Sequence, residues 1–160
     1  LSKLAFIGWG VGSSSLDFSG FSGHAMRAGA VFPVLMYVLL QRAAPRWRHA
    51  GVLAGVAFAV LVAISRVVVH AHSVSEAVSG CVLGLALALG FMWNARGAVN
   101  FAVSHALALA SLALMVLLSF KAEPMPTEQW LQKLALVLSG HERVFSRADW
   151  KLAQDGRPAP

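Results

Sequence analysis

The stretch SRVVVHAHSVSEAVSG, residues 65–80, places an arginine, two histidines and a carboxylate between two long apolar runs. A second polar stretch, FSGHAM at residues 21–26, lies farther upstream and contributes another histidine. Ionisable residues that interrupt apolar segments in this way usually have a chemical function, because they are costly to place there. The first question is therefore whether the two stretches form one site.

The composition of the chain indicates a membrane protein. The 160 residues are 58% hydrophobic and only 12% charged, about half the charged share of a typical soluble domain. The mean hydropathy is +0.67, whereas a soluble fold of this size needs more polar surface. A single cysteine, Cys81, excludes an intrachain disulfide. The net charge of +6 indicates no nucleic-acid partner, because many of the arginines lie in two short breaks between apolar runs.

Four apolar runs are long enough to cross a bilayer as helices, at about residues 25–41, 50–69, 74–93 and 101–120. The third run is rich in small residues, which favours close contact between helices. The predicted fold class is therefore all-α, a polytopic membrane helix bundle with about four transmembrane helices. No internal repeat is present.

The two ends of the chain are expected to lie outside this bundle. Residues 1–20 are predicted to form an irregular outer loop, and because the chain opens with Leu1 we expect a fragment or processed form that lacks upstream helices. Residues 1–120 form the predicted membrane-embedded core, and residues 121–160 a polar C-terminal segment. This segment contains a short amphipathic helix, which either lies in the membrane interface or packs on the bundle. Its apolar residues recur at helical spacing, at Trp130, Leu131, Leu134 and Leu138.

Charge in the connections predicts the topology of the bundle. QRAAPRWRH and NARGAVN, which join the first to the second run and the third to the fourth, carry four arginines and no acid. The positive-inside rule puts both in the cytoplasm. The turn between the second and third runs then lies on the outer side, as does the start of the first run. Residues 21–26 and 65–76 are thus expected at one membrane face.

The spacing of His72 and Glu76 suits acid–base or nucleophilic chemistry. Four residues apart at a helix start, they can share one face, and a carboxylate that accepts the imidazole Nδ1–H leaves Nε2 free to react. Arg66 offers a fork of donors that suits phosphate. A structural interpretation is equally open for the carboxylate, because Ser73 and Glu76 also form a capping-box pattern.

The stretch SGHAM offers complementary groups. Ser22 and the amide of Gly23 are hydrogen-bond donors, and His24 titrates near neutral pH. The structural alternative makes Ser22 a helix N-cap and His24 an interfacial residue. The tripeptide alone is weak, because the chain repeats Ser-Gly-His at residues 139–141 without a histidine at the required interval after it.

These residues resemble the motifs of the type 2 phosphatidic acid phosphatase superfamily, which also includes vanadium haloperoxidases. The family pattern is K-x6-R-P, then P-S-G-H, then S-R-x5-H-x3-D. Residues 65–76 match the third motif with Glu76 in place of Asp, and residues 21–24 match the second with Phe21 in place of Pro. Lys3 is the candidate lysine of the first motif, but Gly10 and Val11 stand where Arg-Pro is expected.

The resemblance implies an integral membrane phosphatase that needs no metal or other cofactor and acts on a lipid phosphate or polyprenyl pyrophosphate. It implies that His72 attacks phosphorus and forms a phosphohistidine, that Glu76 orients His72, and that His24 protonates the leaving alcohol. The phosphate-binding residues that it implies are Arg66, Ser22, Gly23 and Lys3. His70 falls in the variable gap of the third motif and is expected to be non-catalytic.

Two other functions stay open at this point. A degenerate family member could bind lipid phosphates without turnover, as the absent Arg-Pro suggests. A haem-binding membrane bundle would need two histidines facing each other at one depth, and the predicted positions of the histidines disfavour it. We expect the bilayer and a lipid substrate such as phosphatidic acid, phosphatidylglycerol phosphate or a polyprenyl pyrophosphate as partners. The predicted location is a bacterial inner membrane with the site facing the periplasm or outside; the sequence leaves the oligomeric state and the lipid unspecified.

Overall fold

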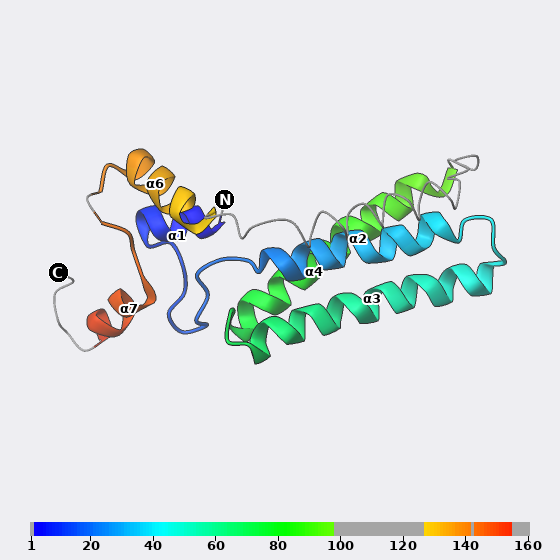
Figure 1. Cartoon of the computed structure of the whole chain (residues 1–160), viewed down its shortest axis with the longest axis horizontal. Helices are drawn as coiled ribbons and strands as arrows, with labels where there is room; N and C mark the ends of the chain where they lie inside the picture. The colour runs from blue at the N-terminus through cyan, green and yellow to red at the C-terminus, as the bar shows by residue number, and fades with distance from the viewer. Residues whose placement is uncertain (1, 98–126, 142, 155–160) are drawn as a thin grey trace. The chain divides into compact units, whose positions relative to one another are not determined.

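A computed structural model describes residues 2–97, 127–141 and 143–154 of the chain. Apart from one isolated bridge between Ser13 and Phe18, the described residues contain no β-structure, so the predicted all-α character is confirmed for this part of the chain. The helices are α1 (Ser2–Trp9), α2 (Gly23–Leu39), α3 (Pro45–Val68), α4 (Val74–Asn94), the 3-10 turn η1 (Ala95–Gly97), α6 (Thr127–Ser139) and α7 (Arg147–Gln154) (Figure 1).

The helices belong to two compact units. One unit comprises residues 1–21, 73–76 and 125–160, and the other comprises residues 22–72 and 77–124. The described part of the second unit consists of α2, α3 and most of α4, together with η1. The first unit contains α1, α6 and α7, as well as the first turn of α4.

Small residues bring α2 into close contact with α3 and α4. A Cβ added at Gly55 of α3 would lie 2.8 Å from the Phe32 carbonyl oxygen, and one at Gly29 of α2 would lie 2.9 Å from the Cys81 carbonyl oxygen. A Cβ at Gly84 of α4 would overlap the Met26 carbonyl oxygen. Backbones approach this closely only where a side chain is missing. The close helix packing predicted from the small residues of the third apolar run is thus confirmed.

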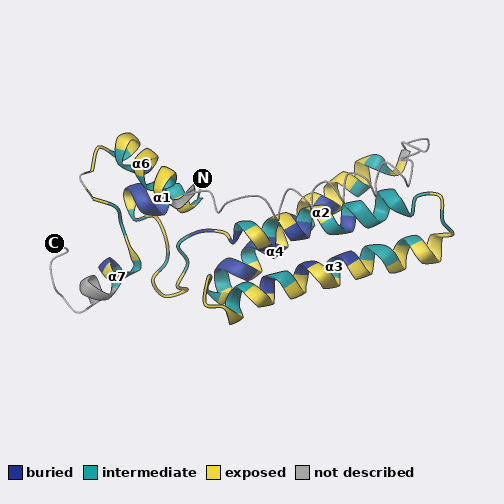
Figure 2. Ribbon diagram, in the orientation of Figure 1, coloured by how far each residue is buried: buried dark blue, intermediate teal, exposed yellow. Residues whose placement is uncertain are grey.

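Small side chains fill the interior of this unit, and large apolar side chains face outward. The buried alanines include Ala25, Ala28, Ala59, Ala63, Ala77 and Ala88. By contrast, only 17% of the apolar window of α3 and 33% of that of α4 is buried, and Figure 2 shows exposed residues along α3. Leu53 and Leu61 of α3 are 67% and 62% exposed, and Leu89 of α4 is 65% exposed. A water-soluble bundle would bury these leucines, so the arrangement indicates a lipid environment.

The predicted spans are confirmed in part. The helices α3 and α4 are long and apolar enough to cross a membrane and coincide with the predicted spans at 50–69 and 74–93. The helix α2 corresponds to the predicted span at 25–41, but at 17 residues it is a shorter apolar helix. The predicted span at 101–120 lies outside the described residues. About four spans were predicted, and the described part of the chain confirms two candidates.

Arginines and aromatic rings gather where α2 ends, α3 begins and α4 ends. The guanidinium of Arg48 lies 5.6 Å from the centre of the Tyr37 ring, and that of Arg96 lies 4.6 Å from the centre of the Trp93 ring. Aromatic and cationic side chains of this kind anchor helices at a membrane surface. The grouping agrees with the positive connections from which the topology was predicted.

The prediction of an irregular loop over residues 1–20 is wrong for residues 2–9, which form α1. This helix packs on α6, where Phe6 and Ile7 of α1 form a buried cluster with Ala135. The side chain of Trp150 closes the cluster edge-on against Phe6, with ring centres 4.9 Å apart. Helix α1 therefore depends on partners more than a hundred residues away, which a local reading of the sequence misses.

The predicted amphipathic helix in the C-terminal segment is confirmed as α6. Leu131 and Ala135 face α1. A second apolar stripe of α6 faces outward, and Trp130 and Val137 on it are 61% and 80% exposed. The helix thus packs against α1 and also presents an apolar face of the kind that lies in a membrane interface.

Candidate active site

Ser22 begins helix α2 and is fully buried. Its side chain accepts a hydrogen bond from the Ala25 backbone N–H at 3.4 Å, so the N-cap interpretation is confirmed. Gly80 of α4 packs against Ser22 so closely that a Cβ there would lie 2.6 Å from the Ser22 carbonyl oxygen. By contrast, a Cβ added at Gly23 would meet no atom within 4 Å. The first amides of α2 are therefore held firmly beside an open space, an arrangement that favours an anion.

A tight turn after α3 brings His72 back toward Arg66. The backbone N–H groups of Ala71 and His72 donate to the Arg66 carbonyl oxygen at 3.0 and 3.2 Å. His70 adopts a positive φ of 53°, a left-handed conformation that lets the chain fold back at the helix end. The spacing of arginine and histidine in the third motif thus corresponds to one local turn, and His70 has a backbone role in it.

Three cationic or titratable groups meet at this end of the second unit. His24 precedes the apolar run of α2, and its pKa is lowered from the ordinary value, first by burial and then by the charges of Arg66, Arg27 and His72. The Nε of Arg66 is buried and has no hydrogen-bond partner among the described residues. A buried guanidinium nitrogen without a partner, beside two imidazoles, forms a site that an anion would stabilise.

The segments that carry these groups also pack together. Ala25 of α2, Ala63 of α3 and Ala77 of α4 belong to one buried cluster, with Val67 of α3 against it. The start of α2 and the end of α3 therefore meet, as predicted from charge and the number of spans. The charges of Arg66 and His72 act on His24, and Ser22 and Gly23 directly precede His24 at the start of α2.

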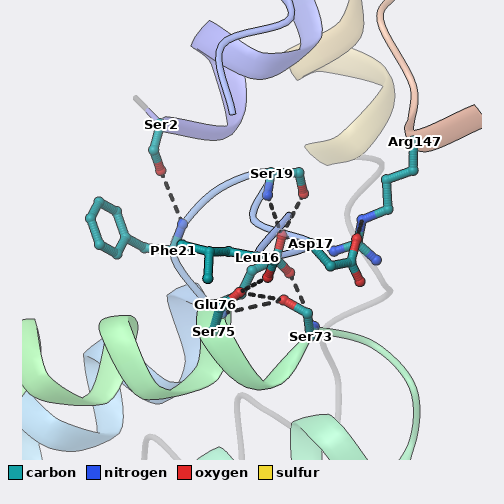
Figure 3. A network of polar contacts seen from close by, with 9 residues as sticks. All are labelled: Ser2, Leu16, Asp17, Ser19, Phe21, Ser73, Ser75, Glu76 and Arg147. Atoms are coloured by element: carbon teal, nitrogen blue, oxygen red, sulfur yellow. Dashed lines mark hydrogen bonds and ion pairs between the residues drawn. The ribbon is translucent and has the colours of Figure 1, made fainter. Parts of the chain in front are cut away.

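Glu76 belongs to the first unit, where its carboxylate is 2% exposed. The Ser73 backbone N–H donates to Glu76 Oε2, and the Glu76 N–H donates to Ser73 Oγ, both at 3.3 Å. The capping box predicted from the sequence is thus confirmed. Ser19 donates to Oε1 through its backbone N–H at 2.8 Å and its hydroxyl at 2.5 Å, and Arg147 lies 2.8 Å from the same oxygen (Figure 3).

Sequence reasoning missed Ser19 and Arg147 as partners of this carboxylate. Ser19 lies in a loop with no periodic pattern. Arg147 follows Ser146 after the second Ser-Gly-His, but the histidine of the third motif is absent behind them. No signal within the sequence itself connects Arg147 to a glutamate 71 positions earlier.

Lys3 also belongs to the first unit, as an exposed residue of α1. Its backbone N lies close to Gly20, where an added Cβ would approach it to 3.0 Å. Gly10, which stands where the first motif has arginine, ends α1 with a positive φ of 68°, and its N–H donates to the Phe6 carbonyl oxygen at 2.8 Å. This position is therefore a helix C-cap, for which glycine is preferred.

The second Ser-Gly-His has a structural role at the end of α6. Gly140 adopts a positive φ of 69° and its N–H donates to the Leu136 carbonyl oxygen at 3.0 Å. His141 Nδ1 lies 2.9 Å from the Gly8 carbonyl oxygen. The tripeptide ends a helix here, whereas at residues 22–24 it begins one. The same sequence therefore has different structural roles at the two places.

Comparisons with known proteins are consistent with these motifs. A family model described as the PAP2 superfamily matches residues 5–100. An uncharacterized 22.5 kDa protein in the cps region of Klebsiella pneumoniae is 35% identical over 153 residues, which cover 92% of this chain and 72% of that protein. Phosphatidylglycerophosphatase B of Bacillus subtilis (strain 168) is 42% identical over 74 residues, 44% of this chain and 36% of that protein. No solved structure gives a significant match.

Proposed function

Because this chain belongs to the PAP2 superfamily, we propose that it is an integral membrane phosphatase that hydrolyses a lipid phosphate or polyprenyl pyrophosphate through a phosphohistidine. The observation that carries the proposal is the convergence of His24, Arg66 and His72 at one end of the α2–α4 unit. The similarity to a phosphatidylglycerophosphatase supports a phosphorylated glycerolipid as one substrate class. Phosphatidic acid, phosphatidylglycerol phosphate and polyprenyl pyrophosphates are the classes to test.

In the first step, Nε2 of His72 attacks phosphorus and forms a P–N bond while the P–O bond to the lipid breaks. His24, as imidazolium, gives its proton to the leaving oxygen. In the second step neutral His24 takes a proton from water, whose oxygen attacks the phosphohistidine and releases inorganic phosphate and His72. Burial, and after it the charges of Arg66, Arg27 and His72, lower the pKa of His24 in the resting protein. The negative charge of a bound phosphate opposes the electrostatic part of this shift, so substrate binding itself favours the acid form.

The remaining site residues hold the phosphoryl group and the nucleophile. The guanidinium of Arg66, whose Nε is buried, and the amide of Gly23 would bind the phosphoryl oxygens, on which charge develops during transfer. Ser22 fixes the first amides of α2 through its cap and adds its hydroxyl to this grip. Lys3 would add a further cation, and Glu76 would hold the imidazole of His72 in the reactive tautomer. No metal ion takes part in this scheme.

We place the protein in a bacterial inner membrane with the site at the periplasmic face. The exposed apolar faces of α3 and α4 and the arginine–aromatic group at the opposite end of the unit support this orientation. The outward apolar stripe of α6 would lie in the interface. Substrate lipids would then reach His72 from the outer leaflet.

The direct test replaces His72 with Ala and measures phosphate release from the three lipid classes in mixed micelles. Loss of the nucleophile should reduce kcat by at least roughly a thousandfold. His70→Gly is the matched control, because it removes a histidine two residues away and suits the positive φ at that position; it should keep wild-type activity. Turnover retained by His72→Ala would contradict the mechanism.

A second candidate function is lipid-phosphate binding without turnover, and Gly10 at the first-motif arginine position favours it. Brief incubation with ³²P-labelled lipid followed by alkaline denaturation separates the two, because phosphohistidine survives base and is lost in acid. Base-stable label on wild type that is absent from His72→Ala supports the phosphatase. Lipid binding without label or phosphate release would favour the binding function.

A further inference from the structure

The C-terminal segment contributes an arginine to the carboxylate of Glu76, although the family match ends at residue 100. Arg147 Nη2 lies 2.8 Å from Glu76 Oε1, and the Glu76 side chain is 2% exposed. Ser19 and Ser73 give neutral donors to the same carboxylate. Arg147 thus brings a full positive charge to a buried carboxylate, the pairing that a buried charge requires.

Hydrogen bonds and ion pairs of the neighbouring residues hold Arg147 in place. Arg147 is the first residue of α7, and Ser146 before it donates to Asp149 Oδ2 through its backbone N–H at 2.7 Å and its hydroxyl at 3.0 Å. Arg143 donates to the other oxygen of Asp149 at 3.0 Å. The Nε of Arg147 is 3.2 Å from Asp17 Oδ1, so one guanidinium joins two carboxylates (Figure 3).

Glu76 is hydrogen-bonded to Ser73, the residue that follows the proposed nucleophile His72. Its Oε2 accepts the backbone N–H of Ser73, which follows His72 in the chain, while Oε1 accepts from Ser19 and Arg147. A carboxylate held from two sides can rotate little. Any change in its orientation would also move the Ser73 backbone and disturb the hydrogen-bonding direction that an imidazole partner needs.

We propose that Arg147 is a positioning residue of the phosphatase, which fixes the orientation of the Glu76 carboxylate so that this carboxylate can orient His72. The inference rests on the proposed function of His72 and Glu76. It assigns a role in the reaction to the segment beyond residue 100. Ser19, which donates two hydrogen bonds to the same carboxylate oxygen, would help to hold it.

Because Arg147 acts through Glu76, its loss should lower kcat and leave KM nearly unchanged. We expect Arg147→Ala to reduce kcat by roughly 10–100-fold, the scale of a displaced catalytic group. Arg147→Lys keeps the charge but loses the planar guanidinium that joins Asp17 and Glu76, so it should recover part of kcat. Arg147 is 40% exposed, so guanidinium ion, at concentrations too low to unfold the protein, should partly rescue Arg147→Ala.

Arg143→Ala is the matched control. It removes the same side chain from the same segment, and its partner Asp149 is likewise a buried carboxylate, but it does not touch Glu76. We expect Arg143→Ala to lower thermal stability while kcat stays within about threefold of wild type and shows no guanidinium rescue. In a Glu76→Gln background, Arg147→Ala should change kcat by less than about threefold, because the two residues act as one unit.

The outcomes separate this inference from the proposed function. Wild-type protein that releases no phosphate from any of the three lipid classes overturns the phosphatase and the role of Arg147 together. An active wild type in which Arg147→Ala and Arg143→Ala have equal kcat overturns the positioning role alone. If Arg147→Ala does not accumulate, Arg147→Lys compared with Arg143→Lys serves instead, and only the first should lose activity.

Discussion

The contact between α2 and α4 should be sensitive to one methyl group at Gly84. A Cβ there would overlap the carbonyl oxygen of Met26 and lie 2.9 Å from the Ala30 backbone N. Both atoms are helix backbone, which cannot rotate away as a side chain could. Gly84→Ala should therefore force the two helices apart. Gly90→Ala is the matched control on the same helix, because a Cβ there meets nothing within 4 Å.

The size of the effect follows from the kind of contact. Extra atoms in a packed interior typically cost 1–3 kcal/mol, and a clash with backbone belongs at the upper end. A cost of about 3 kcal/mol corresponds to a change of about a hundredfold in the equilibrium between the packed and opened helices. Gly90→Ala should leave this equilibrium unchanged or shift it slightly toward the packed state, since alanine favours a helix.

The single cysteine supplies the assay. Cys81 is 7% exposed and lies in a buried cluster with Ala25, Ala63 and Ala77. A maleimide dye reaches its thiol only when the helices separate, and where reclosing is fast the labelling rate follows the opening equilibrium. In detergent micelles, Gly84→Ala should label about a hundredfold faster than wild type. Equal labelling rates for Gly84→Ala and Gly90→Ala would refute the packing argument.

Two further perturbations test the site and the C-terminal segment. Gly23→Ala should leave Cys81 labelling unchanged, because the new methyl group meets no atom within 4 Å. It should reduce kcat/KM for lipid phosphate by about tenfold or more, since the methyl group occupies the space where the phosphate would bind. An unchanged kcat/KM would show that the Gly23 amide is not part of the site. The backbone N–H of Ser146, aided by the side chains of Arg143 and Ser146, holds the pKa of Asp149 below its ordinary value of 3.8, so the ionised carboxylate stabilises the fold above that value and its contribution is lost as pH falls through the folded-state value. Asp149→Asn should therefore lower the unfolding free energy by about 1 kcal/mol at neutral pH. In thermal unfolding curves this difference should shrink as the pH falls below 3.8, and a difference that stays constant in acid would contradict this assignment.

The sequence predicts well those features that depend on neighbouring residues. The second predicted span starts at residue 50, whereas α3 begins at Pro45. The first turn of α3 is polar and basic, so hydropathy alone excludes it, although proline favours the first position of a helix. The caps at Ser22 and at Ser73 with Glu76 were recognised because their partners lie three positions along the chain.

The missed features depend on residues far apart in the chain. Helix α1 is a short segment in a glycine-rich context, and its apolar side chains are buried only because Ala135 and Trp150 cover them. Arg147 and Ser19 meet Glu76 from positions with no shared period or motif. Local propensity carries no information on such pairs, because their energy comes from tertiary contact.

The packing of α1 against α6 has a consequence for the design of truncated or chimeric forms of this protein. The shared family segment, residues 5–100, contains Phe6 and Ile7 but not the helix that covers them. Expressed without its C-terminal partner, that segment would present an apolar patch to solvent and leave Glu76 without its cation. The part of the chain that the family model matches is therefore smaller than the part that packs together, whereas the Klebsiella pneumoniae relative aligns over 92% of the chain. Chimeras with relatives should therefore exchange α1 and α6 together, because the two helices bury each other's apolar side chains.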